Sequence, residues 1–560
     1  MASQYALGVD YGTNSVRALL VDLANGAEIA AEVWDYRHGD AGVIVDSSDP
    51  HLARQSPADY IEGFFASVRG ALALAAATTP NFAPQQIVGV GVDTTGSTAL
   101  PVKAAGVPLA LLEEFRDDPA AQAWLWKDHT AHAEADEITR LAQSRGLPYL
   151  AKCGGTYSSE WYWSKILHCM RTAPRVAEAA ASWVELADFV PAYLSGTTDP
   201  ATMARGICAA GHKAMYHVDW GGLPSAEFLD ALHPGLSRFR YSTAAVPSNR
   251  SAGPLTAEAA AKSGLPAGIP VAVGAFDAHM GAVGAGCGPG ILVKIIGTST
   301  CDCMPAPLSQ RLPDIPGLCG IVPESIMPGY YGLEAGQSAV GDIFKWFVKR
   351  LTPGSYGEGA AAHDALTAEA ARLRPGESGL LALDWNNGNR TIVVDPLLTG
   401  LLLGQTLHTT AAEVYRALVE ATAFGALTII NRFEEYGVRV EQVVNCGGIA
   451  EKSPFVMQVY ADVCNRPMKI SRSAQTCALG AAIFGAVAAG AYPTVEAAQA
   501  QMTGVKSAVY EPRPADAATY ARLYPLYRQL HDAFGSAGWS GSLAGVMKEL
   551  IAVRNEVRKQ

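Results

Sequence analysis

Two segments far apart in the sequence place glycine and hydroxyl residues soon after a run of strand-forming residues. Gly12-Thr13-Asn14-Ser15 comes after residues 5–9, and Gly297-Thr298-Ser299-Thr300 comes after residues 291–296. In such a turn, backbone N–H groups and a hydroxyl can point at a phosphate, and glycine lets a phosphate oxygen approach without a Cβ in the way. One such turn is typical of an ordinary hairpin, whereas two that face each other could hold a triphosphate from both sides.

Two aspartates stand at the ends of predicted strands. Asp10 closes the first strand just before its turn, where a carboxylate could hold Mg²⁺ through water; the alternative is a turn-capping residue. Asp277 lies in an otherwise apolar stretch, residues 271–288, and its alternative is the cap of a helix from Ala278. His279 is interpreted as a packed or capping histidine, because no second metal-type partner lies close to it in the sequence.

Three further segments combine polar side chains with aromatic or small residues. Trp126-Lys127-Asp128-His129 pairs an aromatic face with polar groups, as sugar sites commonly do, although the start of a surface helix has the same composition. Lys213 and Glu334 stand among small residues, which favours the close approach of a ligand; a solvated charge is the alternative for each.

Other phosphate and nucleophile motifs are absent from the sequence. There is no G-x-x-x-x-G-K-[ST], no G-x-S-x-G and no H-E-x-x-H. One G-x-G-x-x-A occurs at Gly357, Gly359 and Ala362, but it follows Pro353-Gly354 and not a strand, so we interpret it as chance.

The composition predicts a globular chain with reduced thiols. The 560 residues are 49% hydrophobic and 17% charged, which is enough chain for about two to four domains. The net charge of −11 and the lack of a basic block argue against nucleic-acid and anionic-membrane partners. The ten cysteines lack metal-site spacing, and the N-terminus lacks a signal-peptide pattern, so we expect a cytoplasmic protein. The uncharged residues 473–495 are expected to form a small-residue helix against a sheet and not a membrane span.

These residues need strands and helices to position them. Alternation predicts an antiparallel meander over residues 5–9, 16–23 and 28–34, with Asn25-Gly26 as a hairpin turn. Further strands are predicted over 87–92, 270–274, 291–296 and 442–445. Helices are predicted over 57–78, 131–145, 159–170, 411–436 and 453–464.

The pattern of strands and turns occurs twice. Besides the two glycine-hydroxyl turns, strand 87–92 leads into Asp93-Thr94-Thr95-Gly96, and strand 442–445 leads into Gly447-Gly448. The repeat distances, about 285 and about 355 residues, are too long for a solenoid. They predict two related α/β domains, residues 1–287 and 288–545, that end near one cleft, followed by a charged tail over 546–560.

The motifs resemble those of the FGGY carbohydrate kinases, in the actin, hexokinase and Hsp70 ATPase superfamily. The resemblance covers residues 5–527 and implies two RNase H-like domains flanking a catalytic cleft that holds ATP and sugar. It also implies Mg²⁺ near Asp10. It rests on Val9-Asp10-Tyr11-Gly12-Thr13-Asn14-Ser15-Val16-Arg17, Gly274-Ala275-Phe276-Asp277, Gly297-Thr298-Ser299 and Gly447-Gly448-Ile449. The ATP contacts expected from it are Gly12, Thr13, Asn14, Ser15, Arg17, Gly297, Thr298, Ser299, Gly447 and Gly448.

Further segments are similar to family members that phosphorylate L-ribulose at its 5-hydroxyl in L-arabinose breakdown. They are residues 91–98, 125–130, 154–161, 210–213, 275–284 and 332–338. This resemblance implies that Asp277 is the base, and that the sugar site is lined by Gly96, Ser97, Trp126, Lys213, Asp277 and Glu334. Ser453 departs from the pattern, because many relatives carry Asn there.

Two other functions remain open from the sequence. One is a kinase for another ketose or polyol, such as D-ribulose, ribitol or xylulose. The other is a nucleotide-switched binding protein of the Hsp70 type, which is disfavoured because no β-rich peptide-binding module follows the core. A homodimer is one option for the assembly, which the sequence does not determine.

Overall fold

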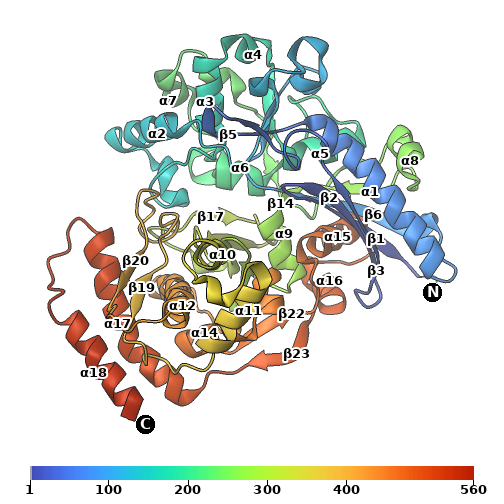
Figure 1. Ribbon diagram of the computed structural model, residues 1–560. Coiled ribbons are helices and arrows are strands. Elements are labelled where there is room, and N and C mark those ends of the chain that lie inside the picture. The colour runs from blue at the N-terminus through green and yellow to red at the C-terminus, as the bar shows by residue number, and fades with distance from the viewer. Residues whose placement is uncertain (1–2, 560) are drawn as a thin grey trace.

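The computed structural model describes residues 3–559, and its first large sheet is built around the N-terminal meander (Figure 1). Strands β1, β2 and β3 are antiparallel, and β6, which pairs with β1, runs parallel to it. The strand order is β12-β13-β6-β1-β2-β3, and β14 also pairs with β6. The strands are β1 (Tyr5–Tyr11), β2 (Ser15–Asp22), β3 (Glu28–Asp35), β6 (Ile87–Thr94), β12 (Ser251–Pro254), β13 (Pro270–Ala272) and β14 (Ala275–Phe276).

The second large sheet repeats this arrangement, as the sequence predicted. Its β15 and β16 are antiparallel and enclose the second glycine turn, and β21 runs parallel to β15 as β6 does to β1. The order is β17-β18-β16-β15-β21-β22-β23. The strands are β15 (Ile291–Ile296), β16 (Thr300–Pro307), β17 (Gly320–Pro323), β18 (Tyr330–Ala335), β21 (Gln442–Cys446), β22 (Met468–Ser471) and β23 (Val505–Tyr510).

A smaller five-stranded sheet is inserted between β3 and β12 and carries part of the predicted sugar site. Its order is β4-β5-β8-β7-β9, and its core is aromatic, with Trp124, Trp163 and Trp183 all buried. Its strands are β4 (Ile44–Asp46), β5 (Asp49–Gln55), β7 (Ala99–Val102), β8 (Ala123–Trp124) and β9 (Ser182–Glu185). The neighbouring helices are α2 (His132–Ser144), α3 (Tyr162–Thr172) and α6 (Ile207–Lys213).

The long helices lie close to where hydrophobic periodicity predicted them. Helix α1 (Pro57–Thr78) packs on β2 and β3, with Tyr60, Phe64 and Val68 buried. By length and apolar content α1 could cross a membrane, but its packing on the sheet accounts for that apolar content. In the second domain, α12 (Ala411–Glu435) begins at a capping box formed by Thr410 and Glu413, and α14 spans Pro454–Cys464.

Two helices join the domains. Helix α9 (Asp277–Gly284) packs against α15 (Thr476–Ala488), and α15 in turn packs on β1 and β6 of the first sheet (Figure 1). The contact is very close, because a Cβ on Gly91 would collide with the carbonyl oxygen of Ala481. The uncharged segment 473–495 is thus mainly a small-residue helix packed on a sheet, as predicted, although the sheet belongs to the opposite half of the chain.

The C-terminal segment differs from the expected charged tail. Residues 546–559 form α18 (Val546–Lys559), which lies beside α17 (Pro514–Gly535) at the C-terminal end of the chain (Figure 1). One side of α18 is buried in the core of the second domain. The buried residues recur at helical spacing, so the segment is an amphipathic helix with its charged residues on the other side. Its overall composition alone did not reveal this helix. The buried residues are Val546, Leu550, Val553 and Val557.

Candidate active site

Three carboxylates meet at one edge of the first sheet. Asp10 in β1 and Asp93 in β6 are directly paired in register on neighbouring parallel strands. Asp277 comes directly after β14, in which Ala275 pairs with Asp93. Because the carboxyl ends of parallel strands meet at the same edge of a sheet, the structure brings these three side chains together. Asp10 and Asp277 were predicted as site residues; Asp93 was missed, although it stands at the end of a predicted buried strand.

The charge of this edge is poorly neutralised by the protein. Burial and the charge of Asp10 raise the pKa of Asp277 to about 7. Burial also raises the pKa of Asp10, although Arg17 lies 3.3 Å from it, between Nη1 and Oδ2, and acts in the opposite direction. Burial, then Asp10 and Asp277, raise the pKa of Asp93 well above its usual value. An oxygen-rich, electron-rich edge of this kind fits a hard divalent cation such as Mg²⁺.

Asp277 is the first residue of α9 and not its cap, so the capping alternative that the sequence left open is wrong: the residue before α9 is Phe276, and the helix has no side-chain cap. The Asp277 Oδ1 accepts a hydrogen bond of 2.6 Å from the backbone N–H of Ala278 at the start of α9. Asp277 thus directly follows strand β14 and is the first residue of α9. This double attachment fixes the position of the carboxylate relative to both elements.

The first glycine turn is open where a ligand could approach. The Gly12 N–H donates to the Ser15 carbonyl over 2.9 Å, and a Cβ on Gly12 would lie 3.5 Å from its nearest neighbour, that same oxygen. The backbone carbonyl of Thr13 accepts a hydrogen bond from Gln55, and the Asn14 amide donates to the Ala41 carbonyl. The turn is therefore held by its neighbours, and nothing in the fold requires glycine at position 12.

The second glycine turn has the same property. Gly297 N–H donates to the Ser299 carbonyl over 2.9 Å, and a Cβ on Gly297 would have no neighbour closer than 4.0 Å. The Thr298 carbonyl accepts from the N–H of Val340, 2.8 Å away. Both turns thus leave room beside a glycine, which agrees with a role in phosphate binding.

Gly447 and Gly448 lie beside the second turn. Gly447 has a φ of +91°, and a Cβ there would lie 2.6 Å from the carbonyl oxygen of Ile296, the last residue of β15. Gly448 begins the short helix α13 (Gly448–Lys452) and has open space around it. Ser453 caps α14 by accepting from the N–H of Val456.

A second buried polar cluster is centred on Glu334 in β18. Its Oε1 lies 3.7 Å from Lys213 Nζ at the end of α6, and its Oε2 lies 3.3 Å from His212 Nδ1 and 3.7 Å from His279 Nε2. Burial alone would raise the pKa of Glu334, but Lys213 and then the two histidines lower it to about 2. The carboxylate is therefore ionised, and its buried Oε2 accepts no hydrogen bond from the described residues, which leaves it free for a ligand hydroxyl.

The two histidines support this cluster. His212 Nε2 lies 3.0 Å from His279 Nε2 and 3.0 Å from Ser325 Oγ, and both rings are buried. Burial lowers the pKa of His279 to about 4 and that of His212 well below its usual value, so both are neutral near pH 7. Their ring nitrogens and Glu334 lie within 4.8 Å of one another, which is also close enough for metal ligands. His279 is packed, as predicted, whereas His212 was not singled out.

Phe276 lies between the two clusters. The ring lies 5.5 Å from Lys213 Nζ, and a Cβ on Gly96 would lie 3.4 Å from the ring. Since Phe276 directly precedes Asp277, the structure gathers Gly96, Lys213 and Asp277 around one aromatic side chain. Ser97 is buried with a φ of +56°, a strained conformation that is concentrated at functional sites.

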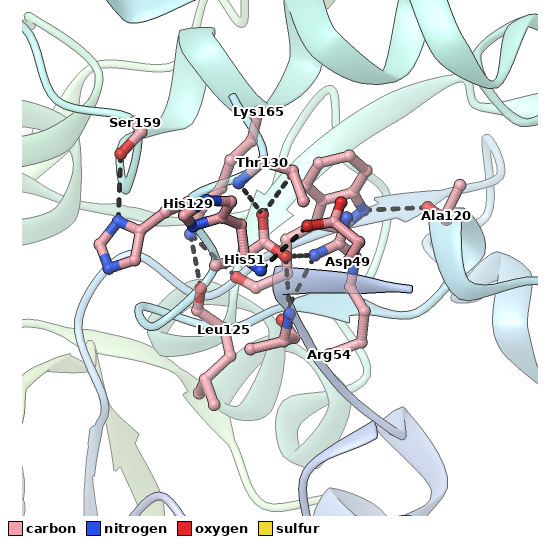
Figure 2. Close-up of polar contacts among 12 residues, drawn as sticks. Asp49, His51, Arg54, Ala120, Leu125, His129, Thr130, Ser159 and Lys165 are labelled. Atoms are coloured by element: carbon pink, nitrogen blue, oxygen red, sulfur yellow. Dashed lines mark hydrogen bonds and ion pairs between the residues drawn. The ribbon is translucent and has the colours of Figure 1, made fainter. Parts of the chain in front are cut away.

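Trp126 connects the sugar-side segment to the first turn. Its Nε1 donates to Thr13 Oγ1 over 3.1 Å, so it lies beside the expected phosphate position. Its neighbours in the sequence have structural roles instead. Asp128 forms a fully buried ion pair with Arg54, and His129 lies 3.1 Å from Ser159 Oγ (Figure 2).

Two buried cationic side chains, Lys165 and Arg54, contact the segment just before Trp126. Lys165 donates to the carbonyl of Leu125 (Figure 2) and to those of Ser97 and Trp124. The Arg54 guanidinium lies 3.5 Å from the centre of the Trp124 ring. Lys165 thus ties this segment to the strained Ser97. Neither Lys165 nor Arg54 was predicted, because a sequence does not reveal which lysines and arginines are buried.

Both parts of the chain match the FGGY family of carbohydrate kinases: residues 5–284 match its N-terminal domain and residues 292–489 its C-terminal domain. The chain is 44% identical over 548 residues to a ribulokinase of Vibrio parahaemolyticus, with 94% of this chain and 95% of that protein covered. It is 43% identical to a ribulokinase of Shouchella clausii, with 99% of each covered. The fold is similar to xylulose kinase from Rhodospirillum rubrum, with a TM-score of 0.79, 24% identity, and 95% of this chain and 99% of that chain covered.

Proposed function

Because the chain belongs to the FGGY family of carbohydrate kinases, we propose that it transfers the γ-phosphoryl group of ATP to the 5-hydroxyl of L-ribulose. The product would be L-ribulose 5-phosphate, in L-arabinose catabolism. The choice of substrate is supported by full-length similarity to proteins named ribulokinase, at 41–44% identity for the most similar. The same proposal includes a cytoplasmic location. It also includes a domain boundary between residues 287 and 288.

The observation that carries the proposal is the position of Asp277 in the acidic edge, directly after Phe276, whose ring lies 5.5 Å from Lys213 Nζ of the Glu334 cluster. Asp277 accepts the proton of the attacking hydroxyl. Its pKa of about 7 suits this role, because a general base works best when its pKa is close to the working pH. The hydrogen bond from Ala278 keeps one carboxylate oxygen fixed and leaves the other free for the hydroxyl.

The two glycine turns position the phosphates of ATP. Gly12, Thr13, Asn14, Ser15 and Arg17 act from the first domain. Gly297, Thr298, Ser299, Gly447 and Gly448 act from the second. Asp10 would hold Mg²⁺, which when bound supplies positive charge against the charge of the transferring phosphoryl group. Phosphoryl transfer depends mainly on positioning and charge stabilisation, and closure of the two domains would exclude water from it.

The Glu334 cluster binds the sugar. Glu334 accepts and Lys213 donates hydrogen bonds to ketose hydroxyls, while Gly96, Ser97 and Trp126 line the remaining wall. Because Lys213 comes from the first domain and Glu334 from the second, sugar binding depends on both domains. This also couples the sugar to the closed arrangement of the cleft.

A coupled assay of ADP release tests the proposal. The purified protein would be given ATP and Mg²⁺ with L-ribulose, D-ribulose, ribitol or D-xylulose, each over a range of concentrations. We expect the highest kcat/KM with L-ribulose and little turnover without sugar. A higher kcat/KM with another acceptor would reassign the substrate, and sugar-independent turnover at the full rate would contradict a kinase function.

A further inference from the structure

Asp93 is a fully buried acid whose hydrogen-bonding partner is the side chain of another acid, Asp10. Among the described residues 3–559, neither Oδ1 nor Oδ2 of Asp93 accepts a hydrogen bond from an N–H or hydroxyl group. Burying an ionisable group in this way costs several kcal/mol unless a charge or a donor compensates it. An Asp that serves packing alone would therefore be replaced by Asn or an apolar residue at little cost, so the carboxylate points to a missing partner.

The neighbours of Asp93 do not supply that partner. Asp10, directly opposite on β1, is within hydrogen-bonding reach but is itself an acid, so a proton shared by the two still leaves the pair without positive charge. Arg17 pairs with Asp10, not with Asp93, and its side chain is 36% exposed. Lys213 is already held by Glu334 in the second cluster. The other titratable group that faces this edge, Cys477 of α15, is a thiol whose pKa is raised well above its usual value by burial and is therefore neutral.

The orientation of Asp93 indicates what the partner is. Residues paired in register on neighbouring strands point to the same face of a sheet, so Asp93 points in the same direction as Asp10. Two carboxylates side by side, with a third from Asp277 next to them, present only oxygen acceptors. This donor set suits a hard divalent cation and not a neutral ligand.

We propose that Asp93 is a second carboxylate for the divalent cation that accompanies ATP, acting together with Asp10. It holds the cation directly or through a cation-bound water, and it compensates its own burial when the cation is present. The inference rests on the proposed function only in assuming that a nucleotide–cation complex binds at this edge.

Binding of Mn²⁺ in place of Mg²⁺ tests the role of Asp93. Free Mn²⁺ would be measured by electron paramagnetic resonance with the full-length protein and ADP, without any sugar. We expect Asp93→Asn to weaken Mn²⁺ binding by about 10- to 100-fold, the range found when a supporting group of a metal site is lost. Because no phosphoryl transfer is measured, a failure of the proposed L-ribulose activity would leave this result intact, and the converse also holds.

Asp384 offers a matched control. It is also a buried aspartate, but its oxygens accept from Gln337 Nε2 over 2.7 Å and from the Tyr527 hydroxyl over 3.0 Å. We expect Asp384→Asn to lower the melting temperature and to leave Mn²⁺ affinity unchanged, whereas Asp93→Asn should raise the melting temperature of the cation-free protein. If Asp93→Asn does not fold, Asp93→Ser removes the charge with a smaller side chain. Mn²⁺ affinity within threefold of wild type in a folded Asp93 variant would overturn the proposal, as would a wild-type protein that binds no Mn²⁺ with ADP.

Discussion

The acidic edge and the Glu334 cluster lie on either side of Phe276, yet they treat a buried carboxylate in opposite ways. At the acidic edge, Asp277 has a pKa raised to about 7 by burial and by the charge of Asp10. In the other cluster, Lys213 and two histidines overcome the effect of burial, and the pKa of Glu334 falls to about 2. Burial is common to both sites, so the neighbouring side chains decide the direction of the shift.

This difference corresponds to two kinds of work. The acidic edge lacks positive charge and is completed by what binds there, so its carboxylates can accept a proton or a cation. In the Glu334 cluster, Lys213 keeps the carboxylate ionised, and the Glu334 Oε2 accepts no hydrogen bond from the described residues, so it can offer an ionised acceptor to a sugar hydroxyl. Within one cleft, the acidic edge would thus act on the reacting groups and the Glu334 cluster would bind the sugar.

The largest effect is expected from Asp277→Asn. The amide keeps the size and the oxygen that accepts from Ala278 N–H but cannot take a proton, so kcat should fall by about 10²- to 10⁴-fold. The KM for the ketose should change much less. Steady-state kinetics of the purified variant, with circular dichroism as the control for folding, would check this. A variant with more than about a third of the wild-type kcat would remove Asp277 from the role of base.

Loss of a partner in the second cluster should act mainly on binding. Lys213→Met and Glu334→Gln each leave a buried group unpaired, at about 1–3 kcal/mol, so the ketose KM should rise by about 5- to 150-fold. The KM for ATP should hardly move, because the glycine turns and not this cluster are expected to contact ATP. If instead the ATP KM rises and the ketose KM does not, the division of the cleft into two sites is wrong.

The pH dependence of activity should reflect the titration of Asp277 in the acidic edge and not that of Glu334. With the base at a pKa of about 7, kcat/KM should fall about tenfold per pH unit below that value. The carboxylate of Glu334, with a pKa of about 2, stays ionised over the same range and adds no further limb. A profile that is flat from pH 5 to pH 8 would contradict this assignment of the base.

The smallest expected effects are on stability, and they should have opposite signs. The folded pKa of Asp277 is above its unfolded value of 3.8, so the protein loses stability as pH rises from about 4 through about 7. Glu334 has a folded pKa below its unfolded value of 4.5, so its contribution is present above about pH 4.5 and is lost as pH falls toward about 2.

Thermal melts at pH 8 would measure this contrast. We expect Asp277→Asn to melt higher than wild type and Glu334→Gln to melt lower, each by a few degrees, because 1 kcal/mol shifts the melting temperature by about 2–4 °C in domains of this size. The matched pair controls for general effects of replacing an acid by its amide. Shifts of the same sign would mean that the two carboxylates are not in opposite environments.

Local patterns in the sequence were sufficient for much of the framework. The boundaries of α1 and β15 agree with hydrophobic periodicity, because a helix or strand that faces a sheet must repeat its apolar residues at a fixed spacing. The two glycine turns and the strand-end position of Asp10 followed from residues that are adjacent in the chain. The resemblance to the FGGY family added the expected roles of Asp277, Lys213 and Glu334.

Only the tertiary structure decided which distant residues meet. Asp93 lies opposite Asp10 because β6 pairs with β1 in one register, and a shift by one residue would turn its side chain to the other face. Glu334 on β18 meets Lys213 and His279 because α6 packs against β17 and α9 packs against β16, the two strands that flank β18. The buried face of α18 and the packing of α15 on the opposite sheet depend in the same way on surfaces far away in the chain. Periodicity is a local property, whereas register and contacts between domains are determined by the packing of the whole chain.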